Sequence, residues 1–245
     1  MRILGIDADT VAREAEAQPL RRGMRMFIAV RTRFAEDALA AAVERGASQL
    51  VVLGAGLDTY AYRSKPSVRL RIFEVDHPAT QEWKRQRLAD AAIPIPDSLT
   101  FAPTDFERQS LSEGLAAAGF DSSQQTFFTW LGVVPYLTEE AFWATLRFIV
   151  SLPNGAHVVF DYSNPPSSFS EQARANYEKR AARVAELGEA WLTHFESNEL
   201  CGKLHELGFS EIEDIGPREI AARYFPGMAK PIPEKGGHIL RTTKI

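Results

Sequence analysis

The short apolar run at residues 49–53 (QLVVL) restricts the fold more than any other segment of this chain. It ends at Gly54 and Gly56, and a run of this length without alternating polar residues is typical of a strand buried on both faces of a parallel sheet. Before it, residues 24–44 carry apolar side chains at spacings of three and four, which predicts a helix with one buried face. A helix therefore precedes the first strand of a predicted sheet.

Strands and helices continue to alternate further along the chain. We expect strands at residues 68–75, 99–102, 125–130 and 156–161, and helices at residues 79–92, at residues 107–118 and after Thr138, which is placed to act as a helix cap. Ser110 and Glu113 have the spacing of a capping box, but we place them inside the helix at 107–118. This order predicts an α/β fold with a doubly wound, mostly parallel sheet that binds ligands at the carboxyl ends of its strands.

The pattern changes after residue 163. Residues 169–191 have a long helical pattern within a predicted helical insertion at 164–193, which we expect to cover the ligand site, although a helix packed only for stability fits the periodicity equally well. A helix at 199–207 precedes strands at 209–215 and 238–241, and because no crossover is evident between these strands, we expect an antiparallel C-terminal pair. No repeat or linker is evident, so residues 1–245 are expected to form a single domain.

Charge and cysteine content exclude several classes of function. The 28 Lys and Arg residues are interspersed with 32 Asp and Glu residues, which weighs against binding to nucleic acid or a membrane surface. No apolar run approaches the roughly 20 residues that cross a bilayer, and the first residues lack a signal-peptide pattern. Cys201 is the single cysteine, so we expect no disulfide, no metal site and a cytoplasmic location. Small molecules or other proteins are the expected partners.

The glycine turn after the first strand is a candidate ligand site. Gly54, Ala55 and Gly56 allow a tight turn and the close approach of a ligand to the backbone, but an ordinary strand-to-helix turn would look the same. A dinucleotide fingerprint would require glycine where Thr59 stands. Asp58 would also repel phosphate, and we interpret it as a cap of the next helix.

Acidic residues follow the second and third predicted strands. Asp76 lies about 20 residues beyond the glycines, where a carboxylate can accept both hydrogens of a ribose diol, and Glu74 shares its face of the strand. Asp105 and Phe106 offer a carboxylate and a backbone amide for adenine, although Asp105 equally suits a helix N-cap. These strand ends describe a nucleoside site without phosphate-binding machinery, which fits S-adenosylmethionine.

Together these motifs resemble the leucine carboxyl methyltransferase family, including its bacterial members. The resemblance rests on VVLGAGLDT at 51–59, Arg63 and FEVDHP at 73–78, and extends to RTRF at 31–34, TDF at 104–106, WLGVVPYL at 130–137 and FDY at 160–162. It implies a class I methyltransferase, Rossmann-like fold with S-adenosyl-L-methionine as cofactor. The first residues of the chain resemble a point already inside the family's N-terminal region.

The resemblance also implies roles for individual residues. Arg31 would pair with the methionine carboxylate of the cofactor, with Arg33 as the second choice, because a guanidinium donates two parallel hydrogen bonds to a carboxylate. The turn at Gly54, Ala55 and Gly56 would lie against methionine and ribose. Asp76, with His77 beside it, would hold the ribose, and Asp105 with Phe106 would hold adenine.

One departure concerns the cofactor's amino group. Leu131 stands where many members of the family carry Glu, so the amino group must instead find backbone carbonyls or water near Leu131.

We therefore expect an O-methyltransferase that methylates a carboxylate of a small molecule. A carboxylate is ionised at pH 7 and needs no general base, so no catalytic residue is assigned. A hydroxyl acceptor would need a base, for which His77 and His194 are candidates. Four aromatic residues would either form a wall around the substrate or pack in the core, the second being favoured for each: Trp130, Tyr136, Tyr162 and Trp191. The alternatives are a catalytically degenerate binding module and, less favoured, a nicotinamide-dependent oxidoreductase.

Overall fold

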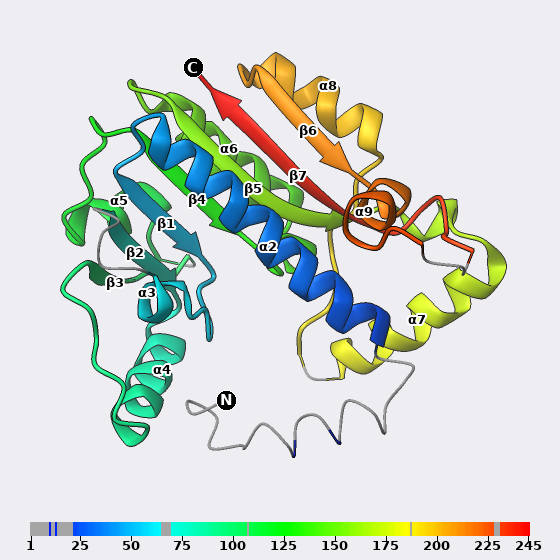
Figure 1. Ribbon diagram of the computed structural model, residues 1–245, viewed down its shortest axis with the longest axis horizontal. Helices are drawn as coiled ribbons and strands as arrows, with labels where there is room; N and C mark the ends of the chain where they lie inside the picture. Colours follow the sequence, from blue (N-terminus) through cyan, green and yellow to red (C-terminus); the bar gives the residue numbers. More distant parts are fainter. Residues whose placement is uncertain are drawn as a thin grey trace.

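The computed structural model describes Thr10, Arg13 and residues 22–64, 70–106, 108–186, 188–227 and 231–245. The resemblance noted for the first residues of the chain, and the start of the strand expected at 68–75, lie outside these ranges. A seven-stranded sheet in the order β3-β2-β1-β4-β5-β7-β6 forms the centre of the molecule (Figure 1). Its strands are β1 (Gln49–Leu53), β2 (Arg71–Asp76), β3 (Leu99–Pro103), β4 (Thr126–Trp130), β5 (Ala156–Ser163), β6 (Glu211–Ile215) and β7 (Gly237–Lys244).

Strand directions confirm the predicted fold class. β1, β2, β3, β4 and β5 pair in parallel, whereas β7 runs antiparallel to both β5 and β6. All five residues of β1 are buried, as expected for an inner strand covered on both faces. The carboxyl ends of β1 to β5 therefore meet at one edge, where the candidate site residues lie.

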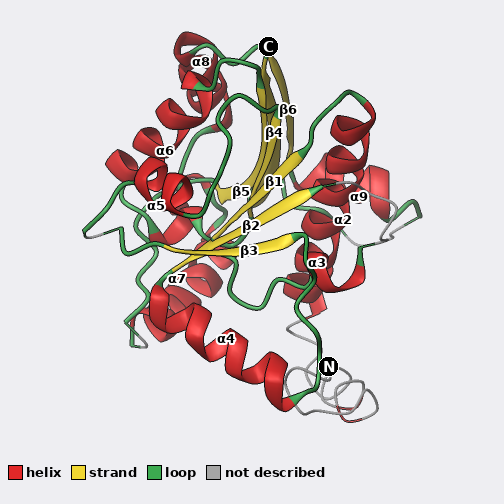
Figure 2. Cartoon of the chain, turned by 90° about the vertical axis from the view of Figure 1, so that its left-hand side faces the viewer, coloured by secondary structure: helices red, strands yellow, loops and turns green. Residues whose placement is uncertain are grey.

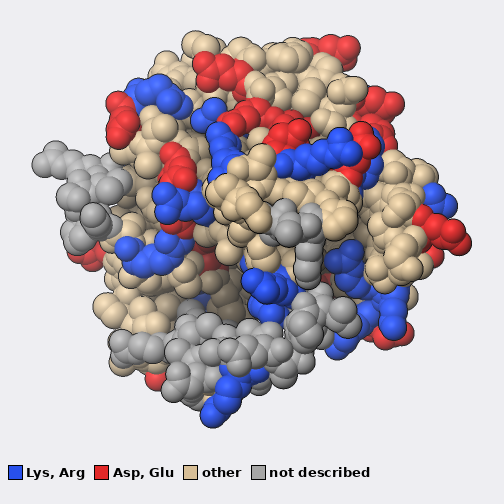
Figure 3. Space-filling model, turned by 45° about the vertical axis from the view of Figure 1, so that its right-hand side comes forward, with Lys and Arg blue, Asp and Glu red and all other residues tan. Residues whose placement is uncertain are grey.

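Helices cover both faces of the sheet (Figure 2). One face packs against α2 (Arg22–Glu44), α3 (Tyr60–Arg63) and α9 (Pro217–Tyr224), and the other against α5 (Leu111–Ala117), α6 (Glu139–Ser151) and α8 (Ser197–Leu207). Further α-helices in the described ranges are α4 (Pro78–Asp90), near β3, and α7 (Glu171–Ala185), and short 3-10 helices lie at Val134–Tyr136 and Pro166–Ser168. Within the described ranges, no helix combines the length and apolar character needed to cross a membrane. Acidic and basic side chains lie beside one another in many places on the face in Figure 3.

The start of α5 differs from the expected helix at 107–118. The helix begins at Leu111, and Ser110 is its N-cap rather than an interior residue. Ser110 Oγ accepts a hydrogen bond of 3.3 Å from the Glu113 amide, and Glu113 Oε2 accepts one of 2.8 Å from the Ser110 amide. This capping box satisfies two backbone donors and sets the helix start, so the placement inside the helix was wrong for Ser110 and right for Glu113.

The insertion also contains less helix than expected. α7 ends at Ala185, and Gly188 adopts a left-handed φ of +83°, which ends the helical pattern before Trp191. The chain then passes the loop after β4, where the amides of Leu192 and Thr193 both donate to the Pro135 carbonyl, at 2.6 and 3.3 Å. The prediction of one helix over 169–191 was therefore too long.

A helix also separates the last two strands, where none was expected. Pro217 occupies the first turn of α9, and the Gly216 amide donates to Glu219 Oε2 at 3.2 Å. Proline in the first turn followed two residues later by an acid, here Pro217 and Glu219, indicates the start of a helix. The glycines and prolines that follow made the whole region look like an irregular connection.

Candidate functional site

The glycine turn after β1 is joined to the end of β2 through Asp76. Gly54 and Gly56 have φ values of +62° and +45°, a conformation that glycine adopts without steric cost. The Gly56 amide donates a hydrogen bond of 2.5 Å to Asp76 Oδ2, and the His77 amide donates one of 2.7 Å to Asp76 Oδ1. Both carboxylate oxygens are thus oriented by backbone amides.

The two glycines of this turn have different surroundings. A Cβ on Gly54 would lie 2.4 Å from Val133 Cγ2, so this glycine lets the turn pack against the loop after β4. A Cβ on Gly56 would meet only the Gly54 carbonyl, at 3.9 Å, which leaves the space above it open. Ala55 secures the turn between them by donating from its amide to the Val75 carbonyl at 3.1 Å. The turn therefore fits a ligand that approaches the backbone at Gly56.

The end of β3 adjoins this part of the site. The Thr104 amide donates to the Asp76 carbonyl at 2.9 Å, which places Asp105 and Phe106 directly beyond the neighbouring strand end. Asp105 Oδ2 pairs with Arg108 Nε at 3.3 Å, and Phe106 is 57% exposed. Because Ser110 caps α5, the interpretation of Asp105 as the helix N-cap is wrong. The exposed ring leaves a surface on which a flat ligand can pack.

Arg31, on α2, lies at the ends of β4 and β5. Its Nη1 donates to Asp161 Oδ2 at 2.8 Å, and the Gly132 amide donates to Asp161 Oδ1 at 2.6 Å. Burial raises the pKa of Asp161, and the Arg31 guanidinium opposes that rise. Arg31 Nε is buried and has no hydrogen-bond partner among the described residues. Gly132 has a φ of +74°, and a Cβ there would lie 2.6 Å from Arg31 Nη2. The guanidinium is therefore held against the turn after β4.

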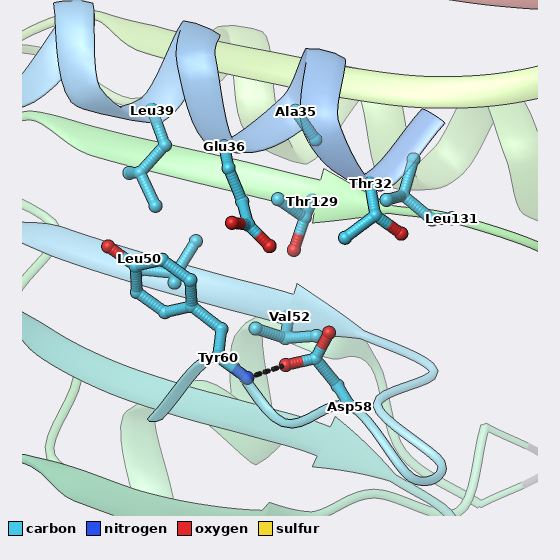
Figure 4. A pocket seen from close by; sticks show the side chains of 10 residues that line it. All are labelled: Thr32, Ala35, Glu36, Leu39, Leu50, Val52, Asp58, Tyr60, Thr129 and Leu131. Carbon is cyan, nitrogen blue, oxygen red and sulfur yellow. Dashed lines mark hydrogen bonds between the residues drawn. The ribbon is translucent and has the colours of Figure 1, made fainter. Parts of the chain in front are cut away.

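Leu131 lines a small cavity between α2 and β1 (Figure 4). The cavity has a volume of about 20 Å³, which is enough for one water molecule. It is lined by Thr32, Ala35, Glu36, Leu39, Leu50, Val52, Asp58, Tyr60, Thr129 and Leu131. Thr32, Glu36 and Asp58 point into the gap from opposite sides in Figure 4. Asp58 Oδ1 also accepts a 2.8 Å hydrogen bond from the Tyr60 amide at the first residue of α3, although the N-cap position itself is Thr59 rather than Asp58.

A buried ion pair behind the glycine turn was not predicted. Lys84 Nζ lies 2.6 Å from Glu74 Oε2, and both side chains are only 1% exposed. Burial raises the pKa of Glu74 to about 7, against the opposing influence of Lys84. Gln81, Lys84 and Leu88 are the buried residues of α4, a spacing that marks one helix face. The spacing of these three residues was the only sequence signal for a buried face of α4, but Gln81 and Lys84 are polar and made that face look solvent-exposed.

The two candidate histidines are already engaged. His77 is the N-cap of α4, where its Nδ1 accepts a hydrogen bond of 3.2 Å from the Ala79 amide. His194 Nε2 contacts the Tyr177 hydroxyl, and burial lowers the pKa of His194. His77 is exposed but uses its Nδ1 lone pair in the cap, and His194 is partly buried against Tyr177.

Most of the candidate aromatic residues pack against other rings. The Trp130 ring stacks on Phe142 with the centroids 5.5 Å apart, Tyr162 is 2% exposed and Trp191 packs against Tyr177 at 5.1 Å. Tyr136 is 36% exposed. The interpretation as core packing thus holds for Trp130 and Tyr162.

The predicted residues form two groups at the carboxyl edge of the sheet. The first group lies at the ends of β1, β2 and β3 and consists of Gly54, Ala55, Gly56, Asp76, His77, Asp105 and Phe106. The second group lies at the ends of β4 and β5 and consists of Arg31 and Leu131. Val133 bridges the groups by packing on Gly54. Asp161 and Gly132 belong to the second group; their motifs were recognised, but no role was assigned to either residue.

Known proteins similar in sequence support a common interpretation of these motifs. Residues 3–150, more than half of the chain, match the model of the leucine carboxyl methyltransferase family. YktD of Bacillus subtilis, named "Putative S-adenosyl-L-methionine-dependent methyltransferase", is 36% identical over 183 residues, covering 74% of this chain and 60% of that protein. A protein of the same description from Mycobacterium marinum is 32% identical over 182 residues, covering 73% of this chain and 59% of its own length. The chain spans about three fifths of the length of these relatives.

Solved structures share the fold at much lower sequence identity. The methyltransferase domain of bacterial CtHen1-C has a TM-score of 0.53 at 13% identity, covering 88% of this chain and 98% of that chain. Magnesium protoporphyrin IX methyltransferase from Synechocystis has a TM-score of 0.50 at 11% identity, covering 98% of this chain and 100% of that chain. These similarities establish a class I methyltransferase fold. Together with the family match over residues 3–150, they show that the chain belongs to the leucine carboxyl methyltransferase family.

Proposed function

We propose that this chain binds S-adenosyl-L-methionine at the carboxyl edge of its sheet and methylates a carboxylate of a small molecule. The observation that carries the proposal is the carboxylate of Asp76, held by the Gly56 amide at the edge of an open glycine turn. An acid at the end of the second strand can accept both hydrogens of a ribose diol. The family match supports the same assignment.

The first group of residues would hold the nucleoside. Asp76 would accept the ribose hydroxyls, while His77 fixes the Asp76 carboxylate through its backbone amide. Asp105 and the exposed ring of Phe106 would receive adenine. When bound, the cofactor supplies an activated methyl group on a sulfonium, so the protein's contribution is orientation and the exclusion of water.

The second group would hold the amino-acid end of the cofactor. Arg31 would receive the carboxylate, and its pairing with Asp161 orients the guanidinium while Nε stays without a partner among the described residues. Leu131 offers no charge to an ammonium group, so backbone carbonyls or water would have to bind it. The carboxylate of Asp58 lines the same cavity as Leu131 and would favour a cation there.

A carboxylate is the acceptor class that these surroundings favour. A hydroxyl must lose a proton during transfer, whereas a carboxylate is already ionised at pH 7. Both histidines considered as bases have other partners, His77 in the cap of α4 and His194 at Tyr177. The engagement of these two histidines favours the acceptor that needs no base.

We also propose that residues 164–193 cover the acceptor side within a single domain of residues 1–245. Leu192 and Thr193 bind the Pro135 carbonyl, which follows β4, and the Thr193 hydroxyl contacts the Leu137 carbonyl. These contacts tie the returning segment to the loop that carries Leu131 and Gly132. The cover would exclude water from the transferred methyl group.

A binding module without turnover is the second candidate. Leu131, in place of the family's usual Glu, favours it, because loss of an ammonium contact weakens the cofactor's hold without changing the fold.

Calorimetric titration with S-adenosylmethionine and its demethylated product tests cofactor binding. The wild-type chain and Asp90→Asn, an exposed acid on α4, should bind both, while Asp76→Ala should lose binding. Absence of binding to the folded wild-type chain would contradict the proposal. Binding of reduced nicotinamide dinucleotide instead would indicate an oxidoreductase.

Turnover is tested separately with cofactor labelled in its methyl group. Small carboxylic acids, paired with the corresponding alcohols, should accept label only as the acids. Label on the alcohols alone would overturn the acceptor class, and cofactor binding without transfer to any acid would favour the binding module.

A further inference from the structure

α4 buries an unusual set of side chains against β2. Lysine is almost never fully buried unless it is paired, yet Lys84 on the inner face of α4 is 1% exposed. Its Nζ donates to Glu74 Oε2 at 2.6 Å, and Gln81 Nε2 donates to the Glu74 backbone carbonyl at 2.6 Å. α4 is thus attached by polar contacts to the strand that ends at Asp76.

Lys84 has a second partner on the glycine loop. Its Nζ donates to the backbone carbonyl of Asp58 at 2.8 Å, two residues after Gly56. The Asp58 carboxylate in turn accepts from the Tyr60 amide at 2.8 Å. One ammonium group therefore joins α4, β2 and the loop between the glycine turn and α3.

Stability alone does not account for this arrangement. Replacing a buried ion pair with apolar residues of similar volume is often neutral or stabilising, because burial removes both charges from water. Glu74 Oε1 and the Tyr62 hydroxyl are also buried without hydrogen-bond partners among the described residues. A buried polar cluster with unsatisfied groups lowers the stability of the fold. The same cluster holds the loop between the glycine turn and α3 in one defined position.

We propose that Lys84 is a positioning residue for the cofactor site: held by Glu74, its ammonium anchors the Asp58 carbonyl and so fixes the loop whose Gly56 amide binds Asp76. Lys84 does not act on the cofactor directly. The inference rests on the function proposed above, and it assigns to α4 a role in cofactor affinity.

The test separates the ion pair from the anchor. Lys84→Met leaves Glu74 buried and unpaired, so it should lower both the unfolding temperature and cofactor affinity. In Lys84→Met/Glu74→Leu both charges of this buried pair are gone, so the unfolding temperature should recover. The Asp58 carbonyl still lacks its donor, and the affinity for the demethylated cofactor should stay about tenfold or more below wild type. Affinity that recovers together with the unfolding temperature would show that Lys84 is only structural.

Two further variants keep the result interpretable. Leu115→Ala removes a buried side chain from α5, on the opposite face from α2, and should lower the unfolding temperature while leaving affinity unchanged. Glu74→Gln retains Lys84 and its bond to Asp58, so its affinity should remain within about threefold of wild type even if the double variant does not fold. A tenfold loss in Glu74→Gln would contradict the anchoring role.

Amide hydrogen exchange tests the anchor without cofactor. The amides of Gly56 and Tyr60 should exchange about tenfold or more faster in the double variant than in wild type, with β5 amides unchanged. Unchanged exchange at both amides would overturn the inference. If wild type binds no cofactor but the loop exchanges as expected, the proposed function fails and the anchor stands.

Discussion

Gly56 and Asp76 are joined by a 2.5 Å hydrogen bond from the backbone amide of the glycine to Oδ2 of the acid. Oδ1 of the same carboxylate accepts from the His77 amide at 2.7 Å. Two backbone donors therefore require two acceptor oxygens at this position, a condition that aspartate meets and asparagine does not. The bond links the glycine turn of β1 to the end of β2, where the ribose is proposed to bind.

Asp76→Asn should weaken cofactor binding and lower stability together. Its side-chain NH₂ must face one of the two backbone amides, a part-buried one at Gly56 and an exposed one at His77, so one hydrogen bond is lost at a cost of about 0.5–1.5 kcal/mol. We expect the dissociation constant for the demethylated cofactor to rise about tenfold or more, measured by calorimetry. The free energy of unfolding, measured in urea, should fall while Asp90→Asn changes neither value. Unchanged affinity in Asp76→Asn would remove Asp76 from the cofactor site.

Asp161→Asn should destabilise the chain far more than Asp37→Asn. Asp161 pairs with Arg31 at 2.8 Å with side chains only 6% and 19% exposed, and breaking such a buried pair costs about 3–5 kcal/mol. The Arg33–Asp37 pair has side chains 70% and 55% exposed, so its loss should cost less than about 1 kcal/mol. Denaturant unfolding of both variants measures the difference. Similar losses would show that Asp161 does not hold Arg31 in place.

Gly132→Ala should be more harmful than Gly188→Ala, although both glycines have a left-handed φ. The φ values are +74° and +83°, so both substitutions carry the conformational cost of about 1–2 kcal/mol. Only Gly132 faces a neighbour, since its added Cβ would lie 2.6 Å from Arg31 Nη2, whereas Gly188 has nothing within 4 Å. The extra loss of stability, together with weaker cofactor binding in Gly132→Ala alone, measures the displacement of the guanidinium. Equal effects in calorimetry and urea unfolding would contradict this contact.

Much of the fold could be predicted because local patterns agree with the tertiary structure. The apolar run at 49–53 is β1 with the predicted boundaries, and Thr138 caps α6 by accepting from the Ala141 amide at 3.2 Å. The link from the glycine turn to Asp76 was also predictable, because parallel neighbouring strands bring their carboxyl ends together. Features that depend on strand order and periodicity are therefore accessible from the sequence.

Features that depend on what a helix is packed against were not accessible. Lys84 and Gln81 look like solvent-exposed residues of a polar helix, and only the fold places Glu74 opposite Lys84. The ion pair of Asp161 could not be predicted for the same reason, since its partner Arg31 is 130 residues away in the sequence. Periodicity also does not show that the helix ends before Trp191, where the chain continues to Leu192 and Thr193 and binds the Pro135 carbonyl.

His157 should make the free energy of unfolding fall as the pH is lowered. It is 4% exposed on β5, its Nδ1 contacts Thr243 Oγ1 at 3.0 Å, and its Nε2 has no partner in the described part of the chain. Burial lowers its pKa from 6.5 to about 4, with Arg45 and Arg241 adding to the effect and Glu211 opposing it.

Between pH 6.5 and 4 the unfolded chain therefore binds a proton at His157 that the folded chain does not, so stability falls as pH falls. The loss of unfolding free energy approaches roughly 3 kcal/mol below pH 4, because the pKa of His157 falls from 6.5 to about 4 on folding and each pKa unit corresponds to about 1.4 kcal/mol. The raised pKa of Glu74 has the opposite sign over pH 4.5 to 7, but it is common to wild type and His157→Gln and cancels in their difference. Urea unfolding of both proteins from pH 7 to 4 should show a smaller loss in the variant, and parallel curves would mean that His157 is protonated equally in both states.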